Sequence, residues 1–200
     1  MLLSVKALGP LETNCYIVNG ALLIDPGDDV PGLDAFIREN GAHIEYALIT
    51  HGHYDHMRGA AHMQQAYGAR LLISRADEQA LFSPEAALVP AETETRFTPC
   101  HADGYLEEGP LALAGVKFTV IPTPGHTPGG ICLYSEAEKT HFSGDTLFRY
   151  GFGRTDMPGG DMHLLVESLR TLLRLPDDTR VWPGHGEGGL MGDIRRSYYR

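Results

Sequence analysis

Four polar motifs, each placed directly after a run of apolar residues, constrain this chain more than any other feature. The apolar runs have the length and composition of strands. The residues that follow them are His51, His126, Asp145 and His185. Strand ends meet at one edge of a sheet, where loops can carry function without disturbing the core. The chain is therefore expected to fold around strands that bring these side chains to a common edge.

The remaining patterns predict alternating strands and helices. Strands are expected at 2–8, 14–19, 21–24, 46–49, 71–73, 116–121, 131–134, 140–142 and 181–182, and helices at 31–40, 59–67 and 161–174. The stretch from Ser83 to Gly104 contains three prolines and no clear period, so it predicts a long loop. With 200 residues, no linker and no strong repeat, the chain is expected to form one domain over residues 1–200.

Composition limits the partners. The net charge is −10 and no cluster of basic residues precedes Arg195, so nucleic acid is not an expected partner. No apolar run approaches the ~20 residues that a membrane span needs, and the N-terminus does not read as a signal peptide. We therefore expect a cytoplasmic protein, a monomer or a small homo-oligomer. Three cysteines far apart in the sequence are expected to be reduced and structural: Cys15, Cys100 and Cys132.

The motif His51-Gly52-His53-Tyr54-Asp55-His56 is the most specific of the four. It places four side chains that can bind a metal ion within six residues. Alternation along an extended turn would put His51 and His53 on one side, with Asp55 and His56 pointing to another. Imidazoles and carboxylates are the ligands that zinc, iron and manganese use in proteins. The motif therefore predicts a metal site.

Three further motifs supply additional ligands. They read PGHTPGG around His126, SGD ending at Asp145, and PGHG around His185. Each of them alone is an ordinary glycine-containing turn. Together with the first motif they provide enough imidazoles and carboxylates for two metal ions. The other five histidines are scattered and are expected to have surface or core roles: His43, His62, His101, His141 and His163.

The order THGHYDH, PGHTPGG, SGDTLF and PGHG resembles the metallo-β-lactamase superfamily, an α/β fold in which two mixed β-sheets with flanking helices form a four-layer αββα sandwich. The resemblance implies two sets of ligands, His51, His53 and His126 for the first metal ion and Asp55, His56 and His185 for the second. It further implies that Asp145 bridges the two ions and that Asp25 braces the His51 loop without binding metal. The implied cofactors are two divalent ions, zinc first, with iron or manganese as alternatives.

Within that superfamily, the sequence is most similar to glyoxalase II, the hydroxyacylglutathione hydrolases. The likeness lies in GPLETNCYIV, in GDTLF and in Gly151-Phe152-Gly153-Arg154, and it is greatest for short members without a C-terminal helical domain. True β-lactamases lack the bridging aspartate, so Asp145 argues against antibiotic hydrolysis. Arg154 matches a basic glutathione contact of the family and is the expected substrate-binding residue, with a surface salt bridge as the alternative.

These features predict a metal-dependent thioester hydrolase acting on small acyl-glutathione thioesters such as S-lactoylglutathione through a metal-bridging hydroxide. Asp55 is expected to act in catalysis as well as to bind metal. A thiolate departs without a proton donor, because thiol pKa values lie near about 8.5. Two alternatives remain open. One is a persulfide dioxygenase with a single iron, which the sequence resembles through GRTD at 153–156, and the other is a non-catalytic metal-binding domain.

Overall fold

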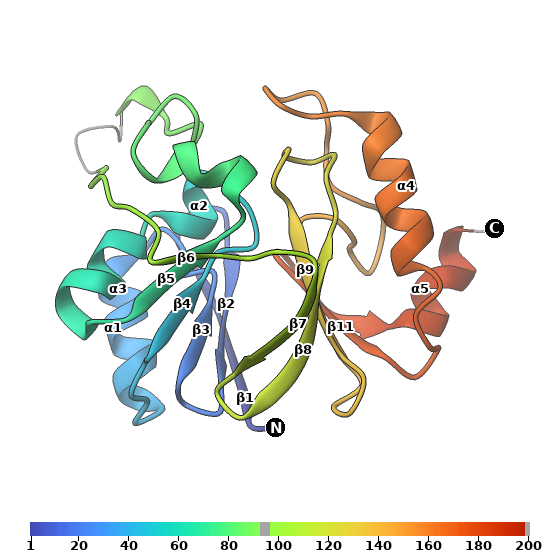
Figure 1. Cartoon of the computed structure of the whole chain (residues 1–200), viewed down its shortest axis with the longest axis horizontal. Coiled ribbons are helices and arrows are strands. Elements are labelled where there is room, and N and C mark those ends of the chain that lie inside the picture. The colour runs from blue at the N-terminus through green and yellow to red at the C-terminus, as the bar shows by residue number, and fades with distance from the viewer. Residues whose placement is uncertain (93–96, 199–200) are drawn as a thin grey trace.

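Two six-stranded sheets face each other, and helices cover the outer side of each (Figure 1). The computed structural model of the chain describes residues 1–92 and 97–198. Helices α1, α2 and α3 lie outside the first sheet, and α4 and α5 lie outside the second. The expected four-layer αββα sandwich of two mixed sheets is confirmed.

The first sheet contains the strands in chain order. They are β1 (Leu3–Leu8), β2 (Thr13–Val18), β3 (Leu22–Ile24), β4 (Tyr46–Leu48), β5 (Arg70–Ile73) and β6 (Gly104–Tyr105). The first three strands are antiparallel, and β3 to β6 are parallel. Asn19 and Gly20, both at positive φ (49° and 70°), form the tight turn between β2 and β3. Helices α1 (Val30–Glu39), α2 (Tyr54–Met57) and α3 (Ala60–Tyr67) lie in the connections between the parallel strands.

The second sheet also follows chain order, from one edge to the other. It consists of β7 (Gly109–Leu113), β8 (Val116–Pro122), β9 (Ile131–Ser135), β10 (Thr140–Gly144), β11 (Arg180–Pro183) and β12 (Gly189–Leu190). Only β10 and β11 are parallel, and α4 (Met162–Leu172) connects them. Helix α5 (Met191–Tyr198) follows β12.

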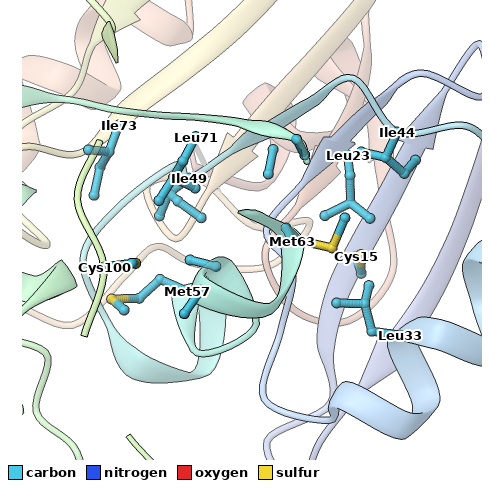
Figure 2. Packing of buried hydrophobic residues seen from close by; sticks show 14 of the residues in the cluster. Cys15, Leu23, Leu33, Ile44, Ile49, Met57, Met63, Leu71, Ile73 and Cys100 are labelled. Carbon is cyan, nitrogen blue, oxygen red and sulfur yellow. The ribbon is translucent and has the colours of Figure 1, made fainter. Parts of the chain in front are cut away.

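Three apolar cores hold the layers together. Alternation along β3 sends Leu22 and Ile24 into the core between the sheets, and sends Leu23 into the core beneath the helices of the first half. Figure 2 shows this second core, where Leu33 and Met63 from the helices meet side chains of the first sheet. The third core packs α4 and α5 on the outer face of the second sheet. Packing on both faces of the sheets therefore fixes the positions at which the strands end.

Several short elements were not expected from the sequence. They are α2, the 3-10 helix η1 (Arg75–Leu81), the strands β6, β7 and β12, and helix α5. Two-residue strands and a four-residue helix are too short to produce a hydrophobic period, which explains why α2, β6 and β12 were not expected. The expected loop at 83–104 contains no strand at 83–92 or 97–103, β6 begins at its last residue, and 93–96 lie outside the described residues.

The three cysteines are buried and free of disulfides. Of the scattered histidines, His43, His101 and His163 are exposed, and His62 contacts Asp34. His141 is fully buried in β10. Among residues 1–92 and 97–198, no helix combines the length and apolar character needed to cross a membrane.

His141 predicts a specific sensitivity to acid. Burial lowers the pKa of its imidazole to about 3, from 6.5. The unfolded chain therefore binds the proton more readily, and this residue costs stability as the pH falls below about 6.5, by about 1.4 kcal/mol per pH unit. We expect the metal-free His141→Leu variant to lose less stability than the wild type between pH 7 and pH 5 in urea unfolding. The exposed His163→Leu control should follow the wild type, and a His141→Leu curve parallel to the wild type would contradict the assignment.

Candidate metal centre

The ends of four strands bring the sequence-predicted side chains to one edge of the two sheets. His51 and His53 follow β4 in the first sheet. The second sheet supplies the other three segments, with His126 after β8, Asp145 after β10 and His185 after β11. The backbone joins the sheets at this edge, because the amide of Asn14 donates to the carbonyl of Gly184 at 2.7 Å. The site therefore lies between the two halves of the fold.

The first motif is not extended along its whole length. His53 has an extended backbone and is the N-cap of α2, whose single turn carries Asp55 and His56. The expected extended conformation is therefore wrong beyond His53, although the expected division, with His51 and His53 in one group and Asp55 and His56 in another, is confirmed. Asp55, His56 and Met57 are all buried in this helical turn; Met57 packs in the apolar core, whereas Asp55 and His56 join the possible ligands. This places Asp55 and His56 near the histidines that precede them.

Among the residues that the structure describes, three overlapping groups of possible ligands form at this edge, and one of them, His51, His56 and Asp145, connects the other two. His51, His53 and His126 form the first group, with ring centroids 4.5–4.9 Å apart. Asp55, His56 and His185 form the second group, in which Nε2 of His185 lies 3.3 Å from Asp55 Oδ2 and 3.2 Å from His56 Nε2. Within each group, the candidate ligand atoms all lie within 4.8 Å of one another. The same six residues were divided in this way by the sequence resemblance.

Asp145 lies between the two groups. Its Oδ1 is 3.4 Å from Nε2 of His56, in the second group. Its Oδ2 is 3.6 Å from Nε2 of His126, in the first group, and 3.4 Å from Nε2 of His185. One carboxylate thus faces ligand atoms of both groups, which is the position that a bridging ligand requires.

The chemistry of the donors fits metal ions. Among the buried side-chain atoms of the described residues that have no hydrogen-bond partner, three belong to this site, namely Nε2 of His51, Nε2 of His126 and Oδ1 of Asp145. Buried polar atoms are normally paired, because leaving one unpaired costs about 1–3 kcal/mol. All three point into the same cluster of possible ligands. Cations coordinated there would satisfy them.

Asp25 acts from behind the ligands. Its carboxylate accepts hydrogen bonds from the amide and hydroxyl of Thr50, both at 2.8 Å, and contacts Nδ1 of His56 at 2.9 Å. Asp25 belongs to none of the clusters that could hold a metal ion. Contact through Nδ1 leaves Nε2 of His56 free to face the centre. The position of Asp25 agrees with its expected bracing role and extends it to His56.

Two backbone carbonyls orient two further histidines, His126 and His185, in the same way. Nδ1 of His126 lies 2.7 Å from the carbonyl of Arg154, and Nδ1 of His185 lies 2.9 Å from that of Leu11. Thr13 donates from its hydroxyl to Asp55 Oδ2 at 2.7 Å. Sequence reasoning missed the roles of Leu11 and Thr13, since a carbonyl and a lone threonine carry no motif.

Electrostatics divide the two groups. Burial, and then the nearby imidazoles, lower the pKa of His51 well below its ordinary value and that of His53 to about 4, so both are neutral. Burial also lowers the pKa of His56 and His185, but Asp55 and Asp145 more than reverse this, to about 9 and about 10. Binding of a cation to the second group would therefore displace protons.

Arg154 has two separate contacts. Its guanidinium donates to both oxygens of Asp156, at 2.7 and 2.6 Å, and both side chains are largely exposed. Its carbonyl supports His126, as described above. The side chain therefore forms the surface salt bridge that the sequence left as the alternative, and its expected role in substrate binding stays a prediction.

An open cavity of about 370 Å³ adjoins the second group. It is lined by Phe148, Arg149, Tyr150, His185, Gly186 and Glu187. Arg149 donates to Glu187 at 2.6 Å, and Phe148 lies beside the ring of His185. Pockets for small molecules start at about 300 Å³. The cavity is therefore large enough for a small ligand next to the histidines.

Comparison with known proteins places these observations in a family. A profile of the metallo-beta-lactamase superfamily matches residues 8–185. The hydroxyacylglutathione hydrolase GloC of Haemophilus influenzae is 35% identical over 198 residues, covering 93% of this chain and 91% of that protein.

Two solved structures are similar in fold and in sequence. The B3 metallo-beta-lactamase BLEG-1 superposes with a TM-score of 0.89 at 31% identity, covering 96% of this chain and 95% of its own. The protein TTHA1623, solved in a di-iron-bound form, superposes with a TM-score of 0.86 at 36% identity, covering 97% and 98%.

We expect Asp145→Ala to lose more metal and more activity than replacement of any one histidine. Asp145 faces both groups, whereas each histidine belongs to one side or lies at their border. Elemental analysis of protein purified without added metal should give close to two ions per wild-type chain and a marked loss in the variant. Retention of both ions with near-normal turnover in Asp145→Ala would contradict the bridging position.

Proposed function

Because the chain belongs to the metallo-beta-lactamase superfamily, we propose that it is a metal-dependent hydrolase of small acyl thioesters, with S-lactoylglutathione as a representative substrate. The observation that carries the proposal is the pair of ligand groups joined by Asp145 beside an open cavity. The 35% identity to a hydroxyacylglutathione hydrolase supports the choice of a thioester.

The residues of the centre would divide the chemical work. Two divalent ions, zinc foremost, held by the groups around Asp145 would lower the pKa of a water toward about 7 and polarise a carbonyl. Asp55 is our candidate acceptor for the proton of the attacking water. Burial opposes its ionisation, but His56, His185 and Thr13 hold the pKa of its carboxyl below the ordinary value. Asp55 therefore enters the reaction as a carboxylate that can accept a hydrogen bond from water.

The cavity beside His185 would take the thiol half of the substrate. Its walls combine the aromatic rings of Phe148 and Tyr150 with the guanidinium of Arg149. A peptide-like thiol offers both apolar surface and carboxylates to such a wall. A thiolate needs no proton donor to leave, since thiols have pKa values near about 8.5. The cavity would therefore need only to recognise the thiol half of the substrate and to exclude competing substrates.

Two other activities have specific support and are kept as competitors. The similarity to BLEG-1 favours testing a β-lactam as substrate. The presence of Asp145 in the sequence argues against β-lactam hydrolysis. The di-iron form of TTHA1623 shows that a protein 36% identical to this chain holds iron, which favours testing an oxygen-dependent reaction. Both competitors would draw on the same metal motifs, the dioxygenase with a single iron.

A three-way assay separates the candidates. We expect purified protein loaded with zinc or iron to release thiol from S-lactoylglutathione, because the site offers a polarised carbonyl and the thiolate leaves unaided. Oxygen uptake with glutathione persulfide and hydrolysis of a β-lactam are measured in parallel. Oxygen uptake without thiol release would move the protein to the dioxygenase class, β-lactam turnover alone to the lactamases, and inactivity in all three assays would reject the proposal.

Arg154 provides a test of how the substrate is held. We expect Arg154→Ala to raise KM for S-lactoylglutathione about three- to tenfold with little change in kcat, since a remote carboxylate contact contributes uniform binding. Asp156→Asn should lower KM, because it frees the guanidinium of Arg154 from its two hydrogen bonds. Arg170→Ala, an exposed arginine paired with Glu167, is the matched control. If KM is unchanged in both Arg154→Ala and Asp156→Asn, the pair is a surface salt bridge with no role in substrate binding.

A further inference from the structure

Asp77 is a buried carboxylate that no sequence motif singled out. It lies in η1, between β5 and the loop that follows, and is 6% exposed. Within residues 1–92 and 97–198, no cation is recorded in an ion pair with it. Three neutral donors satisfy the carboxylate instead: the amide of Gly52 at 2.8 Å, the hydroxyl of Thr127 at 2.7 Å and the amide of Gly129 at 2.6 Å.

The donors belong to the two loops that carry the first group of ligands. Gly52 lies between His51 and His53, and Thr127 directly follows His126. These segments are about 75 residues apart in sequence and come from different sheets. Asp77 joins them through a single side chain. The spacing between His51 and His53 on one side and His126 on the other therefore depends on this carboxylate.

Close packing restricts both loops against η1. A Cβ atom on Gly129 would lie 2.6 Å from Cγ of Asp77 and 2.3 Å from Oγ of Ser74. A Cβ atom on Gly52 would lie 2.8 Å from Cβ of Ala80 and 3.2 Å from Cβ of Asp77. Since real Cβ atoms do not approach so closely, glycine is needed for the two amides to reach the carboxylate. The contact is thus built into both loops.

The two halves of the centre have different braces. Asp25 contacts His56 and also Thr50, which contacts the ring of His51, and so supports one ligand of each group. Asp77 supports only the loops of the first group. Burying a carboxylate without a cation is costly unless hydrogen bonds compensate, and an apolar side chain would fill the position more cheaply. A carboxylate at this position is explained if its negative charge and its three hydrogen bonds act on the ligand loops.

We propose that Asp77 is a positioning residue for the first metal ion, setting the distance between the His51–His53 loop and the His126 loop. The inference rests on the metal-binding part of the proposed function and is independent of the substrate. Loss of the tie should lower the affinity of the first group for a cation and leave the second group, with its own brace, largely intact.

The test is a metal titration of Asp77→Asn. An amide retains the shape of the side chain, but it removes the negative charge and presents an NH₂ group to at least one of the donors, so the tie is weakened. We expect affinity for one of two Co²⁺ ions to fall about 10- to 100-fold, in the range for contacts behind metal ligands. Calorimetry and the cobalt absorption spectrum measure this without reference to catalysis. Asp25→Asn should weaken both ions, because Asp25 contacts Thr50 beside His51 as well as His56.

Asp103→Asn is the matched control. Asp103 also ties two segments, accepting from the amide of Leu71 and the side chain of Gln64, both at 2.8 Å, but it touches no ligand loop. Its variant should retain wild-type affinity for both ions. If Asp77→Asn fails to fold, Thr127→Val removes one of the three bonds and should show a smaller loss of the same ion.

The outcomes distinguish this inference from the proposed function. Unchanged affinity for both ions in Asp77→Asn, even with a lowered unfolding temperature, would overturn the inference and leave a structural role. A wild-type protein that binds only one ion would contradict the binuclear centre. Asp77→Asn would then still have to lower the affinity for that ion, and unchanged affinity in this variant would again overturn the assignment of Asp77.

Discussion

Five imidazole rings and two carboxylates packed together at one edge of two sheets form the arrangement on which the rest of this structure depends. Such a cluster is unfavourable unless its charges and lone pairs are satisfied. The protein provides part of the answer through Asp25 and two backbone carbonyls, each of which contacts the Nδ1 atom of a histidine whose Nε2 faces the cluster, and through Thr13, which donates to Asp55. The inward-facing atoms remain for cations.

The layered architecture makes this concentration possible. The three apolar cores hold the two sheets and their helices together. The polar edge therefore needs to add little to the stability of the fold. Strands from both sheets end there, and their loops are short enough to fix each ligand. The ligands are therefore separate in space from the apolar interior, although they directly follow the strands that form it.

The sequence predicted the sandwich and singled out the seven side chains that now lie together, because long apolar runs and ligand-rich motifs are local signals. It could not predict α2, because one turn after His53 produces no period. It also could not identify Asp77 or Thr13, whose partners are 25–52 and 42 residues away. A single polar residue in an ordinary stretch acquires a role only when folding brings a distant loop to it.

The two ligand groups each combine both halves of the molecule. The first takes His51 and His53 from the first sheet and His126 from the second, and the other takes Asp55 and His56 from the first half and His185 from the last strands. A cation bound in either group would cross-link the two sheets. Binding energy at this edge is then also folding energy. The protein's resistance to heat and to denaturants would rise with the free metal concentration around it, and a strong chelator would act as a destabilising agent.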